Sequence, residues 1–92
     1  MTVLNKRYRA LDGRSDFGFR FVERDGAYDI VCTDHPSLRG RDSSTSKTHL
    51  YDDNRVCFVA GQEPRTLAEA LRRAREWAEY FTRYATTGRE EG

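Results

Sequence analysis

Hydrophobic and polar residues alternate most regularly between positions 17 and 23. Aromatic residues take every second position there: Phe17, Phe19 and Phe21. A period of two is typical of a strand with one buried face. The Asp25-Gly26 pair that follows is a strong signal for a tight hairpin turn. Beyond it the apolar positions keep the same period: Tyr28, Ile30 and Cys32. The pattern therefore predicts a hairpin with an aromatic inner face.

A second kind of pattern follows Thr66. Apolar residues then recur at spacings of three and four: Leu67, Ala70, Leu71, Ala74, Trp77, Ala78, Phe81 and Ala85. This spacing predicts one amphipathic helix with a single buried stripe. Thr66 and Glu69 have the spacing of a capping box, and Gly88 is a typical helix stop.

The remaining segments are less regular. Residues 3–11 mix apolar and basic side chains and predict an edge strand, and the polar residues 37–46 predict a mobile loop. Asp52-Asp53-Asn54 predicts a turn before a short buried strand at Cys57. We expect one domain over residues 1–92, with a frayed tail at 89–92. Its fold class is α+β: a small antiparallel sheet of about three strands, an irregular loop with the cysteine, and a long C-terminal helix packed on the sheet.

Charge and hydropathy exclude several classes. The 92 residues include 16 basic and 15 acidic side chains, a formal net charge of +1. This balance provides no bulk attraction to nucleic acid or to an anionic membrane. Neither an apolar run of about 18 residues nor a secretory signal pattern occurs. We therefore expect a cytoplasmic protein without a membrane segment, and nucleic acid is not an expected partner.

The spacing of the two cysteines favours free thiols over a metal site. Cys32 and Cys57 lie 25 residues apart, without a CxxC pair, and a reducing cytosol disfavours a disulfide. We expect two free thiols and no metal or other cofactor. Cys32 falls on the apolar register of its strand and is expected in the core. Cys57, eight residues after His49, is either a nucleophile or a second buried apolar side chain. His35, just before Pro36, is a weaker catalytic candidate because a surface position is expected there.

This order of elements resembles the ubiquitin-conjugating enzyme fold, and more closely its small bacterial relatives encoded beside nucleotidyltransferases in antiphage signalling operons. In the eukaryotic members a His-Pro-Asn triplet has its asparagine eight residues before the catalytic cysteine, the position that His49 takes before Cys57. The bacterial relatives have His-x-Tyr there, which His49-Leu50-Tyr51 matches.

The resemblance continues beyond the cysteine. The bacterial relatives have a Thr-Leu pair that opens an aromatic-containing helix ending in Thr-Gly, and Thr66-Leu67 and Thr87-Gly88 fit that run. The chain departs from the family at Lys47-Thr48, which replace His-Pro. It is also too short for the flanking helices with which the eukaryotic enzymes meet their activating enzymes and ligases.

The resemblance implies a minimal acyl carrier. Cys57 would form a thioester and pass its acyl group to an amine, and His49 would donate a hydrogen bond to the oxyanion. Tyr51 would orient His49, and Asp52 or Asp53, of which Asp53 is the residue chosen, would help to deprotonate the amine. The donor would be a ubiquitin-like protein or the C-terminus of a nucleotidyltransferase, loaded by an activating enzyme. The alternative is a non-catalytic module of the same fold that binds a protein partner at an open sheet edge or at the polar loop.

Overall fold

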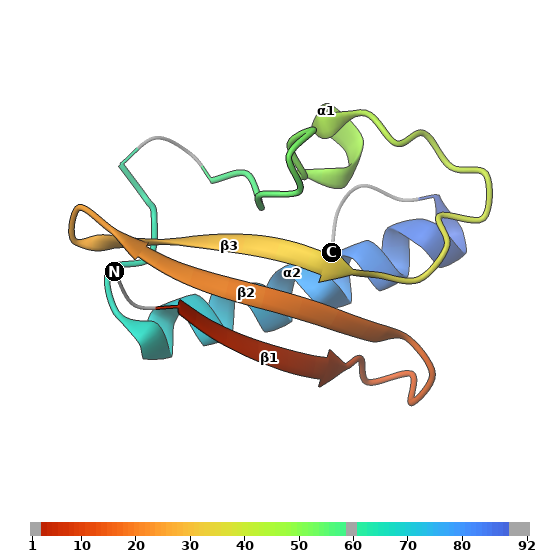
Figure 1. Ribbon diagram of the computed structural model, residues 1–92. Coiled ribbons are helices and arrows are strands. Elements are labelled where there is room, and N and C mark those ends of the chain that lie inside the picture. Colours follow the sequence, from red (N-terminus) through yellow and green to blue (C-terminus); the bar gives the residue numbers. More distant parts are fainter. Residues whose placement is uncertain (1–2, 59–60, 89–92) are drawn as a thin grey trace.

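The computed structural model describes residues 3–58 and 61–88. The elements follow in the order β1 (Val3–Arg9), β2 (Asp16–Arg24), β3 (Ala27–Asp34), α1 (Thr45–Thr48) and α2 (Leu67–Thr87). The strands form one antiparallel sheet in the order β1-β2-β3, and α2 lies across one face of it (Figure 1). This arrangement confirms the α+β class.

The β2–β3 hairpin forms as the alternation predicts. Asp25 and Gly26 both have positive φ angles, 53° and 78°, as a two-residue turn of the primed type requires. The register pairs Phe21 with Ile30 and Phe19 with Cys32 on the inner face. His35 follows the last residue of β3, so the strand ends before the proline, which cannot donate to a ladder.

The core forms between this aromatic face and the stripe of α2. The side chain of Phe17 is fully buried, and its ring meets the edges of Trp77 and Phe81 at centroid distances of 5.8 and 5.7 Å. Six of the eight residues of the predicted stripe are buried: Ala70, Ala74, Trp77, Ala78, Phe81 and Ala85. The other two, Leu67 and Leu71, are partly buried and pack against this core. Thr66 caps the helix by accepting the Glu69 N–H at 3.1 Å, and Gly88 ends it in the left-handed region at φ 77°.

A second row of α2 side chains holds the loop before the cysteine. The indole N–H of Trp77 donates to the carbonyl oxygen of Thr48 at 2.9 Å, and the hydroxyl of Tyr84 donates to that of Asp42 at 2.7 Å. The hydroxyl of Tyr80 donates to the carbonyl oxygen of Lys47. The prediction of an irregular loop over 37–46 needs correction at its end, because Thr45 begins α1.

The other correction concerns the predicted strand at Cys57. Only single bridges form there, between Val31 and Arg55 and between Leu50 and Val56, and Cys57 lies just beyond them. The segment is attached to the sheet without forming a full strand, because the Val56 N–H donates to Ile30 O on the edge of β3 at 2.8 Å. The predicted tail at 89–92 lies outside the described residues. Neither helix of the described part combines the length and hydropathy that crossing a membrane requires.

The buried Trp77 hydrogen bond provides a test of this fold. Thr48 is only 3% exposed, so Trp77→Phe leaves its carbonyl oxygen without a donor and without water. We expect the free energy of unfolding to fall by about 1–3 kcal/mol, measured by urea denaturation followed by circular dichroism.

The matched control is Tyr84→Phe. Its acceptor belongs to the exposed Asp42, which water can reach, so we expect a loss below about 1 kcal/mol. Equal losses in the two variants would contradict the importance of the buried contact.

Candidate functional site

A tight hairpin carries the candidate cysteine. Its first arm begins at His49, which ends α1 in the left-handed region at φ 56° and reverses the chain. The Tyr51 N–H donates to Arg55 O at 2.9 Å, and the Asn54 N–H donates to Tyr51 O at 2.8 Å, which closes the predicted turn. The Cys57 N–H donates to His49 O at 2.7 Å. These bonds place Cys57 directly opposite His49 in the backbone.

Main-chain bonds also attach this hairpin to the sheet. The Cys32 N–H donates to Asn54 O at 2.8 Å, and Val56 donates to Ile30. Val56 is buried, with 6% of its surface exposed, while the next residue, Cys57, is half-buried. The cysteine therefore stands where the chain leaves the core, with its backbone fixed and its side chain within reach of solvent.

Tyr51 is the side chain that meets the sulfur. The Cys57 thiol donates to the Tyr51 hydroxyl at 3.3 Å, and 39% of the tyrosine is exposed. The shared hydrogen bond, before any other cause, raises the pKa of Tyr51. The hydroxyl therefore keeps its proton at neutral pH and can donate to a sulfur or oxygen that gains negative charge.

This contact corrects the role predicted for Tyr51. Its hydroxyl was expected to orient His49, whereas it accepts a hydrogen bond from the Cys57 thiol. The His49 ring instead packs against Tyr80, with centroids 5.2 Å apart. Among the described side chains, the thiol's hydrogen-bond partner is the tyrosine and not the imidazole. His49 thus contributes its backbone carbonyl to the cysteine.

Asp53 helps to position Tyr51 through Arg55. Its carboxylate binds the Arg55 Nε at 2.7 Å, and the Arg55 guanidinium lies 5.2 Å from the centre of the Tyr51 ring. The hydrogen bond from Arg55 lowers the pKa of Asp53. A carboxylate with a lowered pKa is a weaker base, so this geometry favours a positioning role for Asp53 over the predicted role as a base.

Cys32 is the core cysteine that its strand register predicts. It is 2% exposed, and its thiol donates to Asp34 O at 3.3 Å. Burial raises its pKa to about 11. Both thiols are free. Cys57 is therefore the one with access to a reagent.

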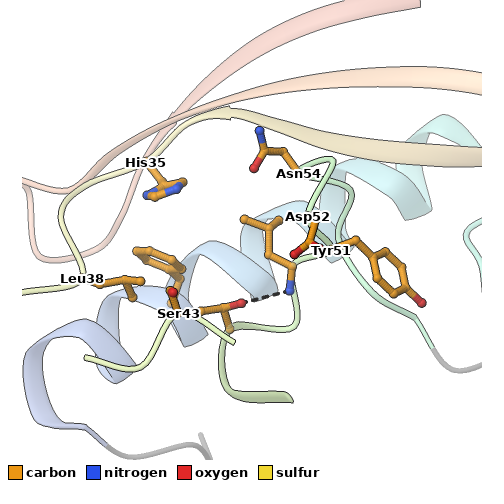
Figure 2. Close-up of a pocket in the computed structure, with 9 residues that line it drawn as sticks. His35, Leu38, Ser43, Tyr51, Asp52 and Asn54 are labelled. Carbon is orange, nitrogen blue, oxygen red and sulfur yellow. Dashed lines mark hydrogen bonds between the residues drawn. The ribbon is translucent and has the colours of Figure 1, made fainter. Parts of the chain in front are cut away.

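A hollow of about 230 Å³ lies on the other side of the hairpin. Figure 2 shows His35 pointing into it from the end of β3 and Asp52 and Asn54 at its border, while the Tyr51 ring points away. His35 packs on Phe81 at 4.9 Å, and its Nδ1 lies 2.9 Å from Pro36 O. The surface position expected for His35 is confirmed, because the residue is exposed at the rim of this hollow.

The described residues hold no group of three or more histidine, cysteine or acidic side chains placed to bind a metal ion. Comparisons with known proteins do not identify the chain: no family model, no curated protein and no solved structure matches it. The site must therefore be interpreted from its own geometry.

The difference between the two cysteines is directly measurable. A pKa of about 11 instead of 9.0 reduces the thiolate fraction of Cys32 about 100-fold at neutral pH. We expect an aromatic disulfide reagent to label one thiol of the folded protein rapidly and to label both in denaturant.

The control variants are Cys57→Ser, which should lose the rapid phase, and Cys32→Ala, which should keep it. Rapid labelling of folded Cys57→Ser would contradict the assignment.

Proposed function

We propose that the protein is a small acyl carrier that forms a thioester at Cys57 and transfers the acyl group to an amine. The observation that supports this most is the hydrogen bond of 3.3 Å between a half-buried thiol and the Tyr51 hydroxyl. A thioester needs a sulfur that a carbonyl carbon can approach and a donor beside the oxygen that becomes negative. Cys57 and Tyr51 have this relation.

The transfer consists of two balanced steps. The Cys57 thiolate attacks the carbonyl carbon of a C-terminal thioester on the donor; a C–S bond forms, and the donor's former sulfur leaves as a thiolate. The attacking amine then forms a C–N bond while the C–S bond to Cys57 breaks. The amine loses a proton to water, and Cys57 returns as a thiolate. Neither step needs an oxidant or a reductant.

Tyr51 takes the role of the hydrogen-bond donor in this proposal. Its hydroxyl remains protonated and lies close enough to the sulfur to reach an oxygen on the adjoining carbon. Arg55 and Asp53 hold the ring in place through the cation–π contact and the ion pair. His49 fixes the backbone of Cys57 through its carbonyl oxygen.

The proposal includes the partners that the sequence resemblance implies. The donor is a ubiquitin-like protein or the C-terminus of a nucleotidyltransferase, delivered by an activating enzyme. In this proposal the acyl transfer takes place in a bacterial cytoplasm as part of antiphage defence. Such partners can bind beside the short hairpin and at the open β1 edge of this small chain.

The direct test incubates the protein with ubiquitin that carries a C-terminal thioester and measures the intact mass without reductant. We expect a covalent adduct that a thiol reductant removes. Cys57→Ala should form none, whereas Cys32→Ala should form it normally.

A short peptide with the sequence of residues 54–58 serves as the matched control for ordinary thiol exchange. We expect the folded protein to exchange at least about ten-fold faster than this peptide, equivalent to about 1.4 kcal/mol of transition-state stabilisation. Equal rates, or an adduct on Cys57→Ala, would reject the acyl-carrier function.

Tyr51→Phe tests the hydrogen-bond donor. It removes one hydroxyl and keeps the ring beside Arg55. We expect acyl transfer to slow about 10- to 150-fold, because a hydrogen bond to a charged group stabilises it by about 1.5–3 kcal/mol. Single-turnover kinetics of the ubiquitin thioester measure this effect.

His49→Ala is the comparison for that variant. Its backbone carbonyl remains, so we expect a smaller effect than that of Tyr51→Phe. The reverse order would restore the role that the sequence analysis predicted for the imidazole.

The second candidate is the non-catalytic module. The observation that favours it is the position of the His49 ring on Tyr80 rather than beside the thiol. If Cys57→Ser retains both the binding of a partner and the cellular phenotype, this candidate replaces the acyl carrier.

A further inference from the structure

The two edges of the sheet differ in whether another segment covers them, and the β1 edge lies apart from the thiol site. The outer edge of β3 is occupied by the hairpin through the bonds from Cys32 to Asn54 and from Val56 to Ile30. Within the described residues, β1 pairs with β2 on one side and with no strand on the other. Figure 1 shows β1 at this open edge. Alternate N–H and C=O groups of β1 are therefore available to a further strand.

A cleft of about 200 Å³ lies beside this edge, between β1 and α2. Apolar side chains form much of it, and cations line it as well; its residues include Lys6, Tyr8, Phe19, Phe21, Leu71 and Arg75. No carboxylate is among the residues that line it. Glu79 contacts one of the lining residues: its carboxylate accepts the Tyr8 hydroxyl at 2.5 Å and also the Leu11 N–H at 3.0 Å.

Along this edge, some cationic side chains form ion pairs with carboxylates, and others form none among the described residues. Arg7 pairs with Asp34 at 3.0 Å, and Arg9 pairs with Asp16 at 2.8 Å, both across the sheet. Lys6 and Arg75, at the cleft, have no ion pair among the described residues. β1 itself contains no acidic residue. The cleft is thus an apolar hollow with two uncompensated positive charges.

We propose that this edge binds an extended acidic segment of a protein partner, which adds a strand to β1. Side chains two residues apart share one face of a strand. An aliphatic side chain of the partner enters the cleft, and Asp or Glu residues two positions before and after it reach Lys6 and Arg75. Main-chain bonds provide affinity, and the cationic rim selects the acidic sequence.

Charge disfavours a second copy of the chain as the occupant. Arg7 and Arg9 have ion-pair partners, but pairing β1 with β1 brings two Lys6 side chains, which have no ion pair among the described residues, into the same strand pair. Like charges opposite one another destabilise a strand pair, and cationic edges commonly prevent self-association. An acidic partner removes this repulsion instead.

The test uses a fluorescent heptapeptide with the sequence Thr-Glu-Thr-Leu-Thr-Glu-Thr and the full-length protein, with binding followed by fluorescence anisotropy. We expect saturable binding that weakens as salt rises. The same peptide with Lys in place of Glu should not bind, and N-methylation of alternate amides should abolish binding. Amide shifts of the labelled protein should change along β1.

Charge reversal in the protein locates the site. We expect Lys6→Glu and Arg75→Glu each to weaken binding about ten-fold or more, because each replaces an attraction by a repulsion. Arg83→Glu makes the same change of net charge on an exposed part of α2 outside the cleft and should leave binding unchanged. Circular dichroism of each variant verifies its fold.

Several results would overturn the proposal. They are absence of binding, equal binding of the lysine peptide, equal weakening by Arg83→Glu, or amide shifts away from β1. Concentration-dependent dimerisation through β1 would make a second copy the occupant and overturn it as well. Cys57→Ala should bind the peptide normally, so failure here is distinguishable from failure of the acyl-carrier function.

Discussion

The hydrogen bond from the Trp77 indole to the carbonyl oxygen of Thr48 determines where the thiol site lies. Thr48 is the last residue of α1, whose final carbonyl groups have no partner within the helix. Both side chains are at least nine-tenths buried, so water cannot replace the indole. The next residue, His49, turns the chain into the hairpin. A helix side chain thus positions a thiol that lies nine residues after its acceptor in the sequence.

This anchoring explains why the hairpin can be so short. Within the hairpin Leu50 and Val56 form a single bridge, which is too little to stabilise an isolated hairpin, and a further bridge from Arg55 to Val31 joins it to β3. The hairpin is stable because α1 is held by α2 at one end and Val56 is buried against β3 at the other. Side chains at its surface, Tyr51 and Cys57, can then vary in exposure without loss of the backbone geometry.

Closure of one sheet edge by the hairpin leaves the other edge open. The thiol lies beside β3, while the cationic cleft lies beside β1, with β2 between them. A partner strand on β1 would therefore not cover Cys57. Under the two proposals, the β1 edge holds a partner and the thiol site exchanges an acyl group with it. Such a division suits a small chain, because a single core of this size supports few additional elements.

Local patterns were sufficient for most of the fold. The alternation of Phe17, Phe19 and Phe21 and the Asp25-Gly26 turn are interactions between near neighbours, so the sequence alone predicts that hairpin. The stripe of α2 and its Thr66 and Gly88 ends are equally local. The resemblance to ubiquitin-conjugating enzymes identified the segment from His49 to Cys57 as the candidate site, and that functional assignment remains a proposal.

By itself, then, the sequence determined the three strands of the sheet, the long helix and the core position of Cys32, because each depends on periodicity or on residues a few positions apart. Only the tertiary structure decided the hydrogen-bond partner of the thiol. His49 and Tyr51 are separated by Leu50 alone, and either side chain could have contacted the sulfur. The packing of His49 on Tyr80 and the ion pair of Asp53 with Arg55 made that choice. The position of His35 in a hollow and the open edge of β1 likewise depend on segments far apart in the chain, whose contacts no local pattern encodes.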